Sequence, residues 1–163
     1  MEVMELRRFS DNIECVEKHL EFIYENLHEI LEKIDEYFPN HISDIQLIRG
    51  YILQYYKKIL EIKLSIDNAV ENKDINVISS AIDTLAKIRK NLRTIRKVLH
   101  QLKLKVLEEL GVDKGGAFLE EIMDCRGNIY AAERHLSEFI TVLENKRQII
   151  LKEKEIQAKE QAT

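Results

Sequence analysis

Residues 6–37, "LRRFSDNIECVEKHLEFIYENLHEILEKIDEY", decide the fold because their apolar residues recur at alternating steps of three and four. This spacing places one continuous apolar stripe along a helix, which is typical of long helices that pack side by side. Pro39 cannot continue a helix, so we expect this one to end near residue 38. The stripe consists of Leu6, Phe9, Ile13, Val16, Leu20, Ile23, Leu27, Ile30, Ile34 and Tyr37.

The same spacing returns three more times along the chain. It predicts helices over about residues 2–38, 43–71, 75–110 and 116–155, joined by short turns. Asp74 is placed to cap the third helix, and Gly111 is placed to end it in a left-handed conformation. The sequence therefore predicts an all-α, antiparallel up-down-up-down four-helix bundle with long, coiled-coil-like helices of unequal length. We expect one domain over residues 1–157, followed by a frayed tail at residues 158–163.

Composition narrows the class of protein. The chain has 163 residues, with 25 lysines and arginines against 29 acidic residues, for a net charge of −4. Its two cysteines, Cys15 and Cys125, form neither a disulfide framework nor a zinc-binding pattern. The N-terminal residues carry no secretory signal, and no apolar run is long enough to span a membrane. We expect a cytoplasmic protein with no membrane span.

The predicted helices place no recognisable chemistry in the core. A di-iron bundle needs inward Glu residues and two Glu-x-x-His pairs, but the only such pair, Glu25 and His28, falls on an outer face. The other histidines lack metal-ligand spacing, and we expect most of them to face solvent. They are His19, His41, His100 and His135. We therefore predict no catalytic residue, no metal and no cofactor, and we expect a protein that is not an enzyme.

The third predicted helix carries a basic run, residues 87–105, "KIRKNLRTIRKVLHQLKLK", with no acid between Asp83 and Glu108. Helical spacing gathers most of these charges on one flank of the apolar stripe, over about 14 residues or ~21 Å. Lys90 and Lys97 point further outward. We call the flank the basic band, and it consists of Arg89, Arg93, Arg96, His100 and Lys103.

The first predicted helix carries an opposite charge along one side. This acidic face consists of Glu14, Glu17, Glu21, Glu25, Glu32 and Asp35. In a monomeric up-down bundle the first and third helices are diagonal, so the acidic face and the basic band do not meet. A second copy of the chain could bring them together. The second helix has an extra apolar flank, which is either a widened core or a dimer interface: Leu53, Tyr56, Leu60 and Leu64.

Three interpretations of these charges remain open. The favoured one is that the charges bind a protein partner or a second copy of the chain. The protein would then be an interaction, adaptor or assembly module, and we expect a homo-oligomer. The second is nucleic-acid or other polyanion binding by the basic band, although no aromatic residue interleaves the run and no reading motif is visible. The third is a solvated face, on which each ion pair contributes only about 0–1 kcal/mol.

Two short resemblances centre on His100. Residues 100–104, "HQLKL", resemble the signature of histidine phosphotransfer domains, which are four-helix bundles whose exposed His accepts a phosphoryl group. In this chain Lys103 matches the family's lysine, but Leu104 replaces its glycine. Arg93 and His100, with Thr94 after the arginine, also resemble the Arg-x6-His spacing of helical HEPN-type ribonucleases. The resemblances imply a phosphotransfer or ribonuclease function as a third alternative.

Overall fold

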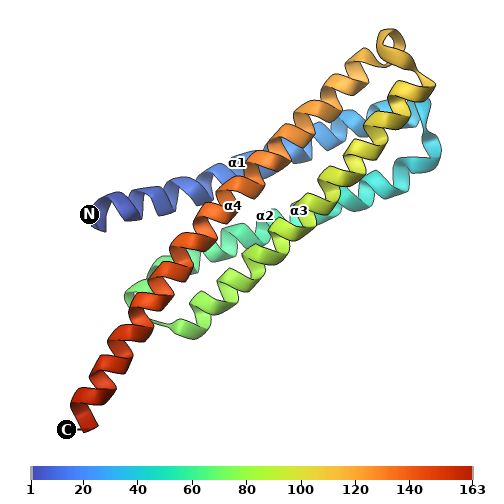
Figure 1. The fold of residues 1–163 in the computed structure, drawn as a ribbon. Coiled ribbons are helices and arrows are strands. Elements are labelled where there is room, and N and C mark those ends of the chain that lie inside the picture. Colours follow the sequence, from blue (N-terminus) through green and yellow to red (C-terminus); the bar gives the residue numbers. More distant parts are fainter. Residues whose placement is uncertain (1, 163) are drawn as a thin grey trace.

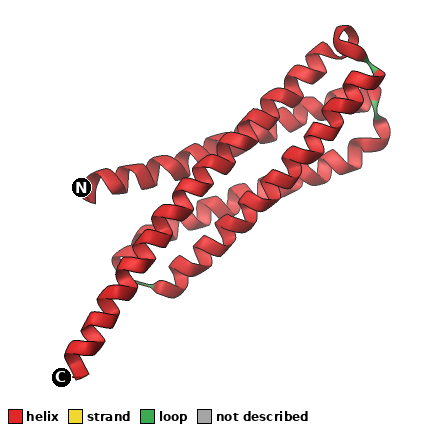
Figure 2. Ribbon diagram, viewed as in Figure 1, coloured by secondary structure: helices red, strands yellow, loops and turns green. Residues whose placement is uncertain are grey.

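The computed structural model describes residues 2–162, and side chains from residue 11 onward. It has four helices: α1 (Glu2–Tyr37), α2 (Ile42–Glu71), α3 (Ile75–Glu109) and α4 (Gly111–Ala162), with a short 3-10 turn, η1 (Pro39–His41), between α1 and α2. Consecutive helices run in opposite directions, and short loops join them (Figures 1 and 2). The predicted all-α four-helix bundle is confirmed.

Each helix packs against two neighbours in a closed ring. The packed pairs are α1 with α2, α2 with α3, α3 with α4, and α4 with α1. The helices α1 and α3 therefore lie on a diagonal of the bundle, as expected for up-down topology.

The buried residues reproduce the spacing read from the sequence, because a helix with one apolar stripe turns that stripe inward. At the end of α1, Phe38 is buried while Tyr37 is only half-buried. Leu6 and Phe9 lie outside the described side chains. The most fully enclosed positions include Leu20, Ile23, Leu27, Ile30 and Ile34 in α1, Ile52, Ile59 and Ile66 in α2, Ile78 and Leu85 in α3, and Phe118 and Phe139 in α4.

Asp74 and Gly111 act at the helix ends as the sequence predicted. The Asp74 side chain accepts a hydrogen bond from Val77 N at 3.2 Å, which caps α3. Gly111 has φ +73°, the left-handed conformation that favours glycine. That conformation turns the chain so sharply that α4 begins at Gly111 itself, five residues before the predicted start at 116.

The fourth helix is the longest, with 52 residues or roughly 78 Å. Near the turn between α2 and α3, Lys73 Nζ lies 2.8 Å from Glu153 Oε2. Beyond this contact α4 projects past the other helices (Figure 1), and residues 154–162 are exposed. Residues 158–162, predicted as a frayed tail, continue the helix in the structure.

Candidate interaction surface

The basic band of α3 is turned toward α4, where a buried carboxylate binds two of its arginines. Arg96 donates to both carboxylate oxygens of Glu133, from Nε at 2.7 Å and from Nη2 at 3.3 Å. Arg93 Nε donates to Glu133 Oε1 at 3.4 Å. Arg89 Nη1 donates to Ser137 Oγ at 3.2 Å. Three of the five residues of the band are therefore engaged inside the chain.

Glu133 is the buried charged residue among the described side chains, with its own side chain only 6% exposed. A buried carboxylate is stable only when cations and hydrogen bonds replace its lost hydration, and the fork of Arg96 supplies both. The sequence reasoning missed Glu133 because it lies on the flank of the apolar stripe of α4 rather than in it. Its position directly after the seam residue Ala132 was the only signal available.

The remaining two residues of the band, His100 and Lys103, are half-buried. His100 Nδ1 is shielded from solvent and has no hydrogen-bond partner in the described part of the chain. Leu104, which replaces the glycine of phosphotransfer domains, is 46% exposed beside it. The expectation that most histidines face solvent is wrong, since all those named with His100 are half-buried as well.

Two carboxylates of the acidic face of α1 bind residues of α2, and most of the face is exposed to solvent. Glu17 Oε2 accepts from Lys63 Nζ at 2.9 Å, and Glu21 Oε1 accepts from the Tyr56 hydroxyl at 3.0 Å. The hydrogen bond to Glu21 is the main reason that the pKa of Tyr56 is raised, and the bond to Glu17 raises the pKa of Lys63. The exposed carboxylates are Glu14, Glu21, Glu25, Glu32 and Asp35, of which Glu32 also lies 3.4 Å from His28.

Helix α2 exposes several large apolar side chains on its outer side. Of the flank predicted from the sequence, Leu53 is 39% and Leu64 81% exposed, while Tyr56 and Leu60 are half-buried. The structure adds two residues that the sequence reasoning did not name, Leu47 at 57% and Tyr51 at 40%. Gly50 lies among them, and a Cβ built on it meets no atom within 4 Å.

On the side of α2 opposite α1, helix α3 presents Lys87 to solvent. Asn91 of α3 forms a side-chain hydrogen bond with Tyr55 of α2, which fixes the side of α3 that faces α2. Lys87 lies one helical turn before Asn91 and is exposed. Lys90 and Lys97 are also exposed, but helical geometry places them nearer to Arg93 than to Asn91, on the outer side of α3. The outer side of α2 is thus flanked by carboxylates of α1 on one side and by Lys87 of α3 on the other, and we call this region the α2 face.

A second surface lies in the groove between α1 and α4, where amide and imidazole side chains form a ladder of contacts. Asn128 Nδ2 donates to Asn26 Oδ1 at 3.0 Å, and His19 Nδ1 lies 3.1 Å from Asn128 Oδ1. His19 stacks on His135 with ring centroids 5.8 Å apart, and His135 Nδ1 lies 3.3 Å from Asn12 Oδ1.

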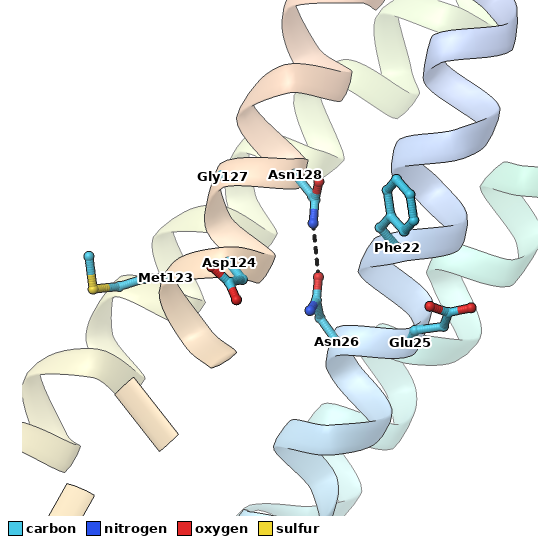
Figure 3. A pocket seen from close by; sticks show the side chains of 7 residues that line it. All are labelled: Phe22, Glu25, Asn26, Met123, Asp124, Gly127 and Asn128. Carbon is cyan, nitrogen blue, oxygen red and sulfur yellow. Dashed lines mark hydrogen bonds between the residues drawn. The ribbon is translucent and has the colours of Figure 1, made fainter. Parts of the chain in front are cut away.

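Figure 3 shows that the two asparagines of this ladder bridge the groove, while Glu25 and Met123 point away from it on opposite sides. Within residues 11–162, no cluster of three or more His, Cys, Asp or Glu residues could hold a metal ion. The ladder fastens α1 to α4, and its two asparagines also line the open pocket drawn in Figure 3. No sequence signal pointed to it, because its members come from distant parts of the chain.

Comparisons of the chain with protein-family models, with curated proteins and with solved structures found no match. Across residues 2–162, no helix combines the length and the apolar character needed to cross a membrane.

Proposed function

We propose that the chain is a non-enzymatic protein-interaction module that docks a partner on the α2 face. The partner presents an apolar helix surface flanked by charges. The observation that carries the proposal is the exposure of Leu47, Leu53 and Leu64 on a helix whose other side is fully used in the core. An exposed group of large apolar side chains with charged residues around its edge is typical of protein interfaces.

The charges support a protein partner better than a polyanion. Arg93 and Arg96, the strongest phosphate-binding groups of the basic band, are bound to Glu133. Lys87 of α3 stands beside the exposed apolar side chains of α2, and the carboxylates of α1 on the other side of α2 repel phosphates. Polyanion binding by α3 would therefore rest on its lysines rather than on these arginines.

The geometry also disfavours the two enzymatic alternatives. A ribonuclease that resembles the HEPN type needs its arginine free to contact phosphate, whereas Arg93 donates to Glu133. A phosphotransfer histidine needs open space around its ring, whereas His100 is half-buried with its Nδ1 shielded. A cytoplasmic location for the module stays a prediction and rests on the two free cysteines.

Photo-crosslinking in the native cell tests the proposal. A photoreactive amino acid is placed at Leu64, in the α2 face, and in a separate variant at Glu144, an exposed position on α4. We expect a discrete protein adduct from position 64, identified by mass spectrometry, and none from position 144. We also expect a second substitution, Leu53→Glu, to remove the adduct. Absence of an adduct at position 64, or the same adducts from both positions, refutes the proposed function.

A further inference from the structure

One row of side chains along α4 lies beside α3. Glu133 accepts a hydrogen bond from Arg96 at 2.7 Å, and Tyr130 lies under the same guanidinium, with Arg96 Cζ 5.4 Å from its ring centroid. Helical spacing continues this row to Arg126 and then to Met123, which points away from α1 (Figure 3). The row therefore runs past the Glu133 cluster along the outer edge of the seam between α3 and α4.

Helix α3 places a second row next to this one. The two helices are antiparallel, so each step forward along α3 matches a step back along α4 (Figure 1). Two turns beyond the contact between Arg93 and Glu133, His100 is therefore level with Arg126. Leu104 lies one further turn along α3. We call the joint surface of the two rows the α3–α4 face, and it consists of Lys97, His100, Leu104, Met123, Arg126 and Tyr130.

The α3–α4 face combines exposed apolar side chains with positive charge. Leu104, Met123 and Tyr130 are each about half exposed, at 46%, 56% and 52%. Met and Tyr are common in protein interfaces, because Met adapts its shape and Tyr supplies a rigid, partly polar ring. Lys97 is exposed beside them, and Arg126 lies one turn before Tyr130.

Almost no acidic residue offsets these charges. Helix α3 has no acid between Asp83 and Glu108. On α4, Glu133 is bound by two arginines, and helical geometry places the other acids of the same stretch on the side that faces α1. They are Glu120, Glu121, Asp124 and Glu138. The α3–α4 face is therefore positive, although the chain as a whole has a net charge of −4.

Arg126 supplies a separate observation on this face. Its side chain is half-buried and forms no ion pair within residues 11–162, and its Nε is shielded from solvent without a hydrogen-bond acceptor there. Arg96, further along the seam, has Glu133 as its counter-charge. A half-buried guanidinium that lacks an anion inside the chain is stabilised by a carboxylate from another molecule, through charge-assisted hydrogen bonds.

We propose that the α3–α4 face binds an acidic amphipathic helix of another protein. The apolar side of that helix covers Leu104, Met123 and Tyr130, and its carboxylates contact Arg126 and Lys97. Nucleic acid fits the face less well, because phosphates leave the apolar side chains uncovered. The inference does not depend on the α2 face. Helices α2 and α4 lie on a diagonal of the bundle, so two surfaces on different sides make the chain an adaptor that joins two partners.

Fluorescence anisotropy with a labelled synthetic peptide tests the proposal. The probe is a helix of about 18 residues, or five turns, with leucines along one side and glutamates along both flanks. We expect the wild-type chain to bind it with micromolar affinity at physiological salt. Lys97→Glu/Arg126→Glu should weaken binding about tenfold or more, because like charges then face each other. Leu104→Gln/Met123→Gln should weaken it about fivefold or more, because apolar contacts are lost.

Matched control variants separate this prediction from general effects of charge and from failure to fold. Lys152→Glu/Lys154→Glu and Ile149→Gln/Leu151→Gln make the same changes at exposed positions near the end of α4, and both should leave the affinity unchanged. Circular dichroism should show the same helix content in all variants. Lys97→Glu alone, at an exposed position, keeps the charge test available if the double variant does not fold.

Distinct results refute the two proposals. No binding of the peptide, or equal binding by the wild type and by the variants of the α3–α4 face, refutes the acidic helix. An oligo(dT) probe that binds more tightly than the peptide, and is lost in Lys97→Glu/Arg126→Glu, assigns the face to nucleic acid instead. Leu53→Glu should not change the affinity for the peptide, and a loss there would place the peptide on the α2 face. Absence of an adduct at position 64 refutes only the docking on the α2 face.

Discussion

Two regions of α3 carry basic residues, but those in one region are bound inside the chain and those in the other are exposed to solvent. On the side that faces α4, Arg93 and Arg96 bind the buried carboxylate of Glu133, and Arg89 binds Ser137. On the outer side of the same helix, Lys87, Lys90 and Lys97 reach solvent. In the sequence these residues form one uninterrupted basic run.

The role of each residue in a basic run depends on which groups of the neighbouring helix it contacts. The carboxylate of Glu133 in α4 binds part of the run and so joins α3 to α4. The remainder is free to contact another molecule. Arginine stands where a buried carboxylate must be held by several hydrogen bonds, and lysine stands where the charge stays hydrated. Four measurements test this difference between bound and solvent-exposed groups.

The largest effect should come from removing the internal charge. Glu133→Gln keeps the shape of the side chain but leaves Arg93 and Arg96 without their counter-charge. We expect the free energy of unfolding to fall by about 2 kcal/mol in urea denaturation. That is less than the 3–5 kcal/mol typical of breaking a fully buried pair, because Arg93 is 57% exposed and Arg96 29% exposed, so water can reach both.

Glu144→Gln, an exposed position on the same helix, serves as the control for Glu133→Gln. It should change the free energy of unfolding by less than about 0.5 kcal/mol. Equal effects of the two substitutions would show that the Glu133 cluster contributes no more than a surface carboxylate.

The closeness of α3 to α4 predicts the next effect. A Cβ on Gly115 of α4 would lie 2.8 Å from Val106 Cγ1 of α3, and valine has little freedom to rotate away. We expect Gly115→Ala to lower the free energy of unfolding by about 1 kcal/mol, because overpacking outweighs the gain from replacing a helical glycine. Gly116, with open space around it, is the matched control, and Gly116→Ala should raise stability by about 0.5–1 kcal/mol. Thermal unfolding of both variants measures the difference, and stabilisation by both would refute the close contact.

Cys125 of α4 is a buried ionisable group and, unlike Glu133, has no ion-pair partner among residues 11–162. Burial raises the pKa of Cys125 from 9.0 to about 12, with smaller contributions from Glu121 and Asp124. Above pH 9 the unfolded chain loses this proton while the folded chain keeps it, so stability falls as pH rises toward 12. Between pH 7 and pH 10 the wild type should lose about 1 kcal/mol more than Cys125→Ala does. Urea denaturation at both pH values tests this, and equal losses would show that the thiol is not shielded.

The sequence predicted the helices and the core because the three-four spacing is a local property of each helix. Three of the predicted helix boundary pairs agree with the structure within one residue, and Asp74 and Gly111 act as predicted. The start of α4 was missed because the left-handed Gly111 turns the chain at once, and no spacer is needed before the next helix.

The contacts between flanks could not be predicted in the same way. They depend on how far each helix is rotated about its own axis against its neighbour, which the apolar spacing leaves uncertain by a large part of a turn. Glu133 and the ladder from His19 to Asn128 both lie on such flanks. The free lysines and the exposed leucines were easier, because an outward position needs no knowledge of a neighbour.

The smallest effect should come from the solvent side of α3. Lys90→Ala and Lys97→Ala should each change the free energy of unfolding by less than about 0.5 kcal/mol, measured at concentrations where the chain is a monomer. Exposed lysines on a helix contribute little to the stability of a single folded chain. Urea denaturation in parallel with Glu133→Gln gives the comparison directly. A loss as large as that of Glu133→Gln would show that the lysines are needed for the fold of one chain. A negligible loss would show that Lys90 and Lys97 contribute little to the fold of a single chain.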